Sequence, residues 1–385
     1  MQTPSAFIRQ IQHALAVLAL GASSLACAAP APADITVVQV APLTGVLSST
    51  GQQMVLGGKI YFDWVNAQGG IYGAKIKHTV VDDGYKVDET VRLTQEALTN
   101  PEVVALFGFA GSANVGKLLS DGVLDVGGAP LVAPYTGAEA LRSPFNPYIF
   151  HVRAGYVDET EHMVHQATTL GMTRIAVMYQ NDAFGKAGLA GVEAALAKRN
   201  MKLLVAASYE RNTDDVADAV KQVKAAEPQA TIMISVNRST AAFAKQYRAI
   251  GGGGQLYNIS VVDPAELVKL AGVKAVHGLG ISQVVPFPFG ANKPAVREYQ
   301  ALMKKYGGGQ PVSYTSFEEF LGAKVLVEGL RRAGPAPTRA KLVKALESID
   351  NFDLGGTRIS YSPTNRIGSR FVEVTVIGAS GKLLR

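Results

Sequence analysis

The sequence predicts an α/β protein made of two lobes, each a doubly wound parallel sheet covered by helices. Strand-like and helix-like patterns alternate over almost the whole chain, as in parallel strands joined by helical crossovers. Beyond residue 33 the chain keeps about 350 residues, more than one hydrophobic core usually supports, so two domains are expected. The alternation restarts near residues 147–153. It therefore forms two consecutive α/β units, which share no sequence repeat.

The first unit is expected to contain four strands and three helices. Its opening strand is a continuous apolar run (ITVVQV), which indicates a strand buried in the sheet. Gly69 and Gly70 end the helix that follows, and the next helix stops before Pro101. The expected strands are residues 35–40, 75–81, 103–107 and 130–133, and the expected helices are residues 52–66, 88–98 and 113–124.

The second unit repeats this alternation, and a less regular tail follows it. Its expected strands are residues 174–179, 202–207, 231–235 and 256–260, and its expected helices are residues 183–199, 214–226 and 240–250. The tail can complete both units if the chain crosses between them more than once. Its expected elements are an extended segment at 278–285, helices at 294–306, 315–333 and 338–348, and strands at 357–361 and 371–377.

The first 33 residues predict export from the cytoplasm. Arg9 is followed by a short apolar run (ALAVLAL) and then by small residues, which is the order of a secretory signal peptide. The apolar run is too short to span a bilayer. Cleavage after Ala28 or Ala33 would remove Cys27 and leave a mature chain without cysteine. The alternative is a lipoprotein that keeps Cys27, although Ser24 stands where a large aliphatic residue is expected. The predicted location is the periplasm.

The charge pattern argues against nucleic acid as a partner. The net charge is +6, and Arg9 carries one of these charges, which leaves +5 after the leader is removed. Lys and Arg are scattered, and no run of five occurs. A mild positive charge is compatible with a small anionic ligand.

One segment resembles a nucleotide-binding loop but lacks a required residue. Gly111 to Lys117 (GSANVGK) follows a strand and opens a helix, but Leu118 stands where a Ser or Thr must bind Mg²⁺. Two interpretations stay open. The turn is a carboxylate site at a helix N-terminus, where free N–H groups point at the ligand, or it is a tight turn that caps the helix.

The sequence predicts no catalytic residue, no metal and no cofactor. His162 and His165 are three apart on an expected helix, a spacing that can hold a metal, but no HExxH motif or further nearby ligand accompanies them. A G-x-S-x-G nucleophile motif is absent, because Ser112 follows Gly111 directly. The paired acids Asp82 and Asp83 end a strand, where such residues usually cap a turn or bind water.

Two aromatic residues follow strands at the edge where ligands bind. Tyr135 comes after the fourth expected strand, and Phe184 lies in the turn after residues 174–179. Ligands of open α/β sheets bind beyond the carboxyl ends of the strands. Tyr135 and Phe184 can thus face one ligand from two domains, or each can pack on its own helix.

Taken together, these features resemble periplasmic solute-binding proteins of the branched-chain amino-acid type, the receptors of ABC importers. The resemblance covers residues 34–385. The segments that carry it, in order along the chain, are VAPLTG at 40–45, NAQGGI at 66–71, FGFAGS at 107–112, YQNDAFG at 179–185 and ANKP at 291–294. It implies a type I periplasmic binding fold with three hinge crossings. Lobe one would be residues 34–151 plus 283–366, and lobe two residues 152–282 plus 367–385.

The resemblance also implies a ligand site between the lobes. Family members hold a ligand carboxylate with a Ser after the third strand, here Ser112, and with groups after the fourth strand. They close on the ligand by hinge motion. The implied residues in lobe one are Ser112, Tyr135, Thr136 and Gly137, and those in lobe two are Phe184, Val236, Ser260 and Val261.

One position departs from the amino-acid binders of this family. They carry an acid in lobe two that pairs with the ligand ammonium, whereas this chain has Ser260, Val261 and Val262 there. Burying an ammonium without a counter-charge is costly. The expected ligand is therefore a small carboxylate or amide without an α-ammonium, with an aromatic body as one option. Asp263 is the alternative partner for an ammonium, although Asp263-Pro264 more naturally starts a helix.

The predicted function is a monomeric receptor, not an enzyme, that delivers a small molecule to an ABC membrane permease. Two alternatives keep the same fold: a sensory or chemotactic ligand-binding module, and a binder of branched-chain amino acids proper. A secreted enzyme would need a catalytic group in the cleft, and the sequence offers none.

Overall fold

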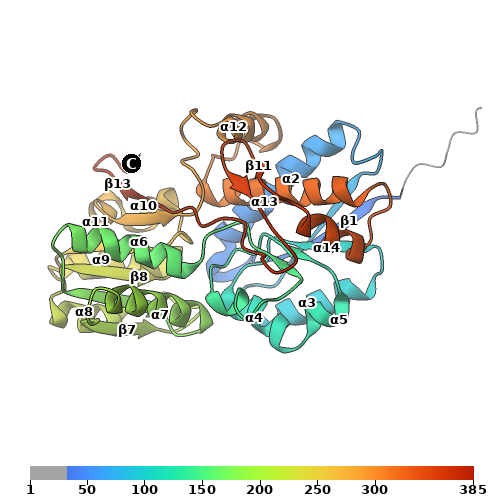
Figure 1. The fold of residues 1–385 in the computed structure, drawn as a ribbon. Helices are drawn as coiled ribbons and strands as arrows, with labels where there is room; N and C mark the ends of the chain where they lie inside the picture. Colours follow the sequence, from blue (N-terminus) through green and yellow to red (C-terminus); the bar gives the residue numbers. More distant parts are fainter. Residues whose placement is uncertain (1–32) are drawn as a thin grey trace, which may run out of the picture. The chain divides into compact units, whose positions relative to one another are not determined.

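The computed structural model describes residues 33–385 (Figure 1). The predicted signal peptide, with Cys27, lies outside the described residues apart from Ala33. Among the helices of residues 33–385, none combines the length and apolar character needed to cross a membrane.

The first sheet has five parallel strands in the order β2-β1-β3-β4-β5. All seven residues of β1 are buried, which explains its continuous apolar sequence. Because the strand order reverses between β1 and β3, the carboxyl ends of these strands are where a ligand is expected. The strands are β1 (Ile35–Ala41), β2 (Ile76–Asp82), β3 (Val103–Phe107), β4 (Leu131–Val132) and β5 (Ile149–Phe150).

Helices cover both faces of this sheet (Figure 1). On one face, α2 and α13 pack so closely that a Cβ on Gly57 would lie 2.1 Å from the Ser316 carbonyl oxygen. The helices of this face are α2 (Ser48–Ala67), preceded by the short η1 (Gly45–Leu47), α12 (Pro294–Tyr306), α13 (Tyr314–Ala333) and α14 (Arg339–Glu347). The other face carries α3 (Val87–Thr99), α4 (Ser112–Ser120) and α5 (Val123–Gly127).

The second sheet has seven strands in the order β14-β13-β10-β9-β8-β6-β7. Strands β6 to β10 run parallel to one another. Strands β13 and β14 lie at one edge of the sheet and pair antiparallel. The strands are β6 (Ile175–Gln180), β7 (Val205–Tyr209), β8 (Ala230–Ile234), β9 (Gln255–Asn258), β10 (Gly280–Gln283), β13 (Glu373–Ile377) and β14 (Leu383–Leu384).

This sheet is also covered on both faces. One face packs against α6 (Tyr156–Thr169) and α7 (Ala183–Ala197). The opposite face packs against α8 (Ala217–Ala226), α9 (Asn237–Ala249), α10 (Pro264–Ala271) and α11 (Val273–Val276). Short elements complete the chain: η2 (Glu139–Leu141), β11 (Phe352–Asp353) and β12 (Arg358–Ile359).

One apolar core cluster joins the two sheets. It contains Val38 and Leu106 of the first sheet together with Val177 and Ile234 of the second. The chain passes between the layers of the two sheets three times, after β5, after β10 and after β12. The predicted fold class, with two sheet lobes and three crossings, is confirmed.

Two element predictions need correction. The single helix expected at residues 113–124 is two helices, α4 and α5, because Gly122 adopts a left-handed conformation (φ 66°) that ends the first. The strand expected at residues 202–207 is β7, which begins at Val205 and ends at Tyr209. Its register against β6 pairs Val205 with Ala176 and Tyr209 with Gln180, which extends the strand to Tyr209.

Candidate functional site

The site begins where β3 turns into α4. Gly111 has φ 96°, and a Cβ there would lie 2.5 Å from Asn114 Oδ1 and 2.8 Å from the Tyr85 ring. Only glycine fits this turn without strain. The turn places Ser112 as the first residue of α4, so its hydroxyl lies beside the unpaired N–H groups of the helix N-terminus.

Three hydroxyl-bearing residues meet at this helix end, and we call them the hydroxyl cluster: Ser112, Thr136 and Tyr156. The Ser112 and Thr136 hydroxyls are 2.7 Å apart, and the two side chains are 3% and 0% exposed. Burial raises the pKa of the Tyr156 phenol, while the nearby Arg153 guanidinium and the Ser112 and Thr136 hydroxyls oppose that rise. The cluster offers hydrogen-bond donors in a buried place, which suits a carboxylate.

Gly137 fixes Tyr156 against this cluster. The Gly137 carbonyl accepts a hydrogen bond of 2.7 Å from the Tyr156 backbone N–H. A Cβ on Gly137 would lie 2.6 Å from the Tyr156 ring. The absence of a side chain at residue 137 thus allows α6, which belongs to the second sheet, to approach the loop after β4.

Tyr135 links the loops of both sheets. Its hydroxyl donates to the Ser260 carbonyl at 3.3 Å and lies 3.2 Å from the Thr315 hydroxyl. The Arg153 guanidinium carbon is 4.9 Å from the centre of its ring. Burial raises the pKa of the Tyr135 phenol, so it stays protonated and can donate this hydrogen bond.

Phe184 enters the same region from the second sheet. Asp182 caps α7 by accepting hydrogen bonds from the N–H groups of Phe184 and Gly185. The Phe184 ring is buried and packs edge-on against Tyr156 with the ring centres 5.6 Å apart. It therefore contributes an apolar wall beside the hydroxyl cluster.

The remaining predicted residues of the second sheet lie in the same core. Val236 and Val261 are buried in the cluster that also contains Tyr135, Tyr156 and Phe184. Ser260 is buried and polar: its N–H donates to Glu159 at 2.8 Å, and its hydroxyl binds Arg153. Asp263 accepts a hydrogen bond from the Glu266 N–H and caps α10, as its place before Pro264 suggested.

Two further sets of contacts hold the sheets together around these residues. Arg211, in the loop after β7, donates to Asp182 at 2.8 Å, to the Tyr85 carbonyl at 2.8 Å and to Asn114 at 2.7 Å. The Asn237 amide of α9 lies 3.4 Å from the Ser49 hydroxyl and 3.3 Å from that of Thr50, both on α2. Arg211 and Asn237 of the second lobe thus add direct contacts with the first lobe.

Comparison with known proteins identifies the family. The family model described as "Periplasmic binding protein" matches residues 34–382. The chain belongs to the periplasmic binding protein family. Membership makes it a ligand-binding receptor and implies a periplasmic location.

Solved structures and sequence relatives agree with this family. A substrate-binding periplasmic protein from Ralstonia solanacearum is 38% identical and covers 91% of this chain and 99% of its own, with a TM-score of 0.87. An extracellular ligand-binding receptor from Verminephrobacter eiseniae is 30% identical over 91% of this chain and 100% of its own, with a TM-score of 0.85. Leu/Ile/Val-binding protein homolog 7 of Brucella suis is 27% identical over 90% of this chain and 88% of its own length.

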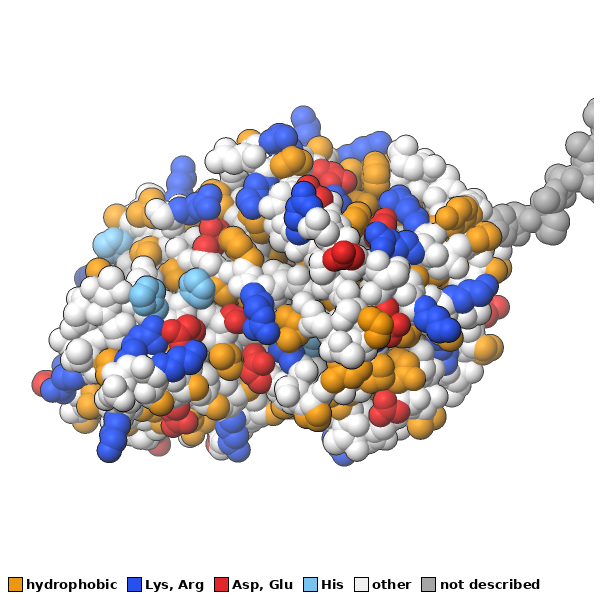
Figure 2. Space-filling model, viewed as in Figure 1, with side chains coloured by type: hydrophobic (Ala, Val, Ile, Leu, Met, Phe, Trp, Pro, Cys, Tyr) orange, Lys and Arg blue, Asp and Glu red, His pale blue; other side chains and the backbone are white. Residues whose placement is uncertain are grey.

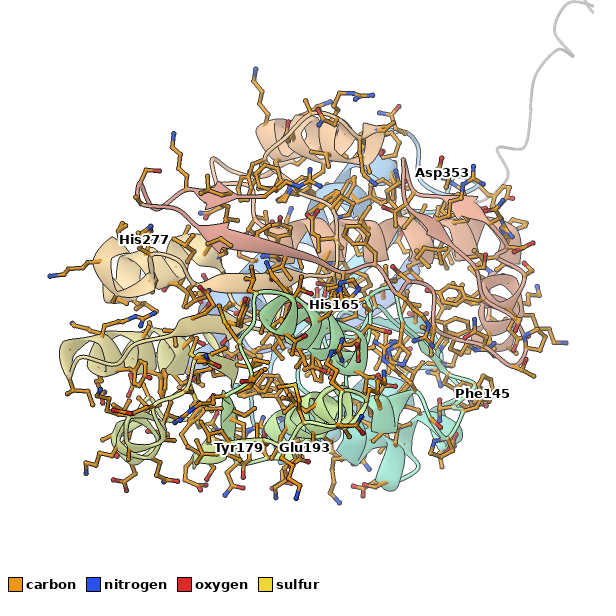
Figure 3. The ribbon with its side chains drawn as sticks, turned by 60° about the vertical axis from the view of Figure 1, so that its left-hand side comes forward. Phe145, His165, Tyr179, Glu193, His277 and Asp353 are labelled. Atoms are coloured by element: carbon orange, nitrogen blue, oxygen red, sulfur yellow. The ribbon has the colours of Figure 1, made fainter. Side chains whose placement is uncertain are left out.

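The residues weighed for other chemistry have the following surroundings in the structure. Lys117 of the P-loop-like segment binds Asp121, the residue that caps the end of α4, at 2.6 Å. His162 and His165 are exposed on α6, and His165 and His277 lie well apart in Figure 3. Within residues 33–385 no group of three or more His, Cys, Asp or Glu residues could hold a metal. On the face shown in Figure 2, Lys and Arg are scattered among acids rather than gathered.

Sequence reasoning missed several residues of the site. The sequence spacing of three residues links Arg153, Tyr156 and Glu159, and it puts Tyr156 and Glu159 on one face of α6. This spacing could have indicated from the sequence that the three residues lie together. Arg211 had no such signal, because its partners Tyr85 and Asn114 lie about a hundred residues earlier in the chain.

Proposed function

We propose that this protein is an extracytoplasmic receptor that captures a small carboxylate-bearing ligand between its lobes and delivers it to an ABC importer. The observation that carries the proposal is the meeting of Ser112 and Thr136 from one lobe with Tyr156 and Phe184 from the other. Hydroxyl donors at a helix N-terminus suit an anionic group, and the aromatic walls suit an apolar body.

The charges around the site support a ligand without an α-ammonium. Ser260 stands where related amino-acid binders carry an acid, and its hydroxyl is bound to the guanidinium of Arg153. The nearby acids of the second lobe are engaged: Asp182 pairs with Arg211 at 2.8 Å, Glu159 pairs with Arg153 at 3.1 Å, and Asp263 caps α10. An ammonium beside Ser260 would face the Arg153 cation, and the second-lobe acids around it are already paired or capping a helix.

The organisation implied by this function is part of the proposal. Lobe one comprises residues 34–151 and 283–366, and lobe two residues 152–282 and 367–385, with the leader removed on export. The ligand-binding residues are Ser112, Tyr135, Thr136, Gly137, Phe184, Val236, Ser260 and Val261. The receptor acts as a monomer, performs no catalytic step and docks on a membrane permease.

A second candidate ligand is a branched-chain amino acid. The name of the Leu/Ile/Val-binding relatives from Brucella favours it. It would require the ligand ammonium to find carbonyl oxygens in place of an acid.

A thermal-shift screen followed by calorimetry separates these candidates. The probes are L-leucine, L-valine, benzoate, 4-hydroxybenzoate, succinate and benzamide, each added to the mature protein. We expect a carboxylate without an ammonium to raise the melting temperature, since a ligand at 100 times its Kd adds about 2.7 kcal/mol of stability. Micromolar binding of leucine or valine, with no binding of the other acids, would reject the proposed ligand class and favour the second candidate.

A further inference from the structure

A buried ion cluster lies beside the proposed site and touches both lobes. Its centre is Arg153, which is 1% exposed. One guanidinium nitrogen of Arg153 lies 3.1 Å from Glu159, and the other lies 3.3 Å from Glu318. We define the cluster by its charged members: Arg142, Arg153, Glu159, Glu318 and Glu319.

The members of the cluster belong to different lobes. Glu159 is on α6 and accepts hydrogen bonds from the Ser260 N–H at 2.8 Å and from the Ser282 hydroxyl at 2.6 Å, which ties it to the second sheet. Glu318 is on α13, whose neighbouring residues pack in the core of the first sheet. The contact between Arg153 and Glu318 is therefore an ionic contact between the lobes.

The cluster holds three acids and only two bases. Both carboxyl oxygens of Glu319 are buried and have no hydrogen-bond partner within residues 33–385. A buried carboxylate without a partner is unfavourable, and burial accordingly raises the pKa of Glu319 well above its usual value. With Glu319 neutral, the remaining charges of Arg142, Arg153, Glu159 and Glu318 balance.

Several titratable groups surround this cluster. Tyr156, on α6, and Tyr135, in the loop after β4, face Arg153 and have raised pKa values because of burial. His151 lies near Arg142, and burial holds its pKa well below the usual value. Glu139 and Asp158 are further acids that lie near Arg142. Glu318 differs from these groups because its ionic partner belongs to the other lobe.

We propose that Glu318 makes lobe closure proton-linked: closing removes its carboxyl from water beside Arg153, and a proton bound there favours the closed form. This inference rests on the proposed two-lobed receptor. In this structure, where Glu318 contacts Arg153 of the other lobe, burial raises the pKa of Glu318 to about 7. With the lobes apart, the carboxyl meets water and titrates near the ordinary value of about 4.3. Closed protein therefore binds more protons between these values, and closure weakens as the pH rises from 6 to 8.

Cross-linking of two introduced cysteines measures the closed population without any ligand. The pair is Ser49→Cys with Asn237→Cys, in a Cys27→Ala background. The native side chains approach to 3.4 Å across the lobes. Ser49 lines an open groove of about 800 Å³, so a short bifunctional thiol reagent can reach the pair. The cross-linking rate is measured from pH 6 to 8 in this two-cysteine protein, the parent, and in the parent carrying Glu318→Gln. Dividing one rate by the other cancels the pH dependence of the thiols.

We expect the ratio of the parent rate to the Glu318→Gln rate to fall roughly tenfold between pH 6 and 8, the change that one proton with these pKa values produces. Glu328→Gln is the matched control, since Glu328 lies on the same helix and pairs with Arg332 at 2.7 Å within it. The ratio of the parent rate to the Glu328→Gln rate should not change between pH 6 and 8. A constant Glu318→Gln ratio, or an equal fall for Glu328→Gln, would overturn the inference.

Two features keep the test decisive. If Glu318→Gln does not fold, the parent cross-linking rate is divided by the rate at which a monofunctional reagent modifies the same thiols, and the same fall is expected. Because no ligand is added, failure of the ligand screen does not affect the outcome. Ligand-induced closure that is insensitive to pH would reject the proton linkage and leave the receptor function standing.

Discussion

The guanidinium of Arg211 lies over the ring of Tyr85, with its central carbon 3.8 Å from the ring centre. Arg211 belongs to the loop after β7 of the second sheet, and Tyr85 precedes α3 on the first. The same guanidinium binds Asp182, the Tyr85 carbonyl and Asn114. Planar stacking combined with several directed hydrogen bonds is a task that lysine cannot take over. This contact thus joins the lobes at one side of the proposed site.

We expect Arg211→Lys to shift the protein toward the open form. The substitution keeps the charge opposite Asp182 but removes the stacking and the forked hydrogen bonds, at a cost of about 1–2 kcal/mol. The cross-linking rate of the Ser49 and Asn237 cysteine pair should fall roughly 5- to 30-fold. Arg248→Lys is the control, because Arg248 binds two carbonyls within the second lobe. Equal rates for the Arg211→Lys protein and its parent would contradict the role of this contact in closure.

Removal of a hydroxyl from Ser112 or Thr136 should weaken binding without unfolding the protein. Each hydroxyl is proposed to donate to the ligand carboxylate, and loss of such a bond costs about 1–3 kcal/mol. Ser112→Ala and Thr136→Val should each raise Kd about 5- to 150-fold for the best ligand of the screen, measured by calorimetry. Thr94→Val removes a buried hydroxyl that bonds within α3, so its Kd should equal that of the parent. Unchanged affinity in both site variants would place the carboxylate elsewhere.

Tyr156→Phe tests whether the second lobe also reaches the carboxylate. The ring would keep its contact with Phe184 while the phenol next to Ser112 and Thr136 is lost. We expect a Kd raised about tenfold and a melting temperature of the free protein close to that of the parent. Tyr257→Phe removes a buried phenol in the second sheet and should leave Kd unchanged. A lower melting temperature with normal affinity would assign Tyr156 a structural role only.

The fold was predictable because its signals are local. Buried parallel strands such as Ile35–Ala41 are apolar throughout, and glycines mark the ends of helices. The rule for carboxyl ends of strands brought Tyr135 and Phe184 to one region from their positions alone, whereas Ser112 was added by the family resemblance. The break between α4 and α5 was missed because Gly122 interrupts a pattern that otherwise continues as helical on both sides.

The contacts that complete the site could not be predicted in the same way. Arg153 binds Ser260, which is 107 residues away in sequence, and Arg211 binds the Tyr85 carbonyl across 126 residues. No periodicity links such positions, because their meeting depends on how the lobes pack. Glu318 and Glu319 fall in a helix whose buried residues include the apolar Phe317 and Phe320, so their burial followed only from the three-dimensional arrangement.

His78 should make stability depend on pH below neutrality. Burial between Phe62 and Phe107 lowers the pKa of His78 to about 4, against about 6.5 in the unfolded chain. The folded pKa is the lower one, so stability is complete above pH 6.5 and is lost as the pH falls toward 4. The lowered pKa of His78 makes about 1–3 kcal/mol of the free energy of unfolding depend on pH. Urea unfolding between pH 7 and 4.5 should show that the His78→Gln protein loses less free energy of unfolding than the parent. His162→Gln, an exposed change on α6, should follow the parent.

Two glycines in helices of the first lobe should respond to alanine in opposite directions. At Gly57 of α2 a methyl group would lie 2.1 Å from the Ser316 carbonyl oxygen and 2.9 Å from the Glu319 Cβ, so α2 and α13 must separate. At Gly116 of α4 a methyl group meets no atom within 4 Å. Gly57→Ala should therefore destabilise the protein by about 1–3 kcal/mol, whereas Gly116→Ala should stabilise it by roughly 0.5–1 kcal/mol through helix propensity. Denaturant midpoints at unchanged slope measure both effects. Equal shifts of one sign would mean that the close contact between α2 and α13 does not limit residue 57.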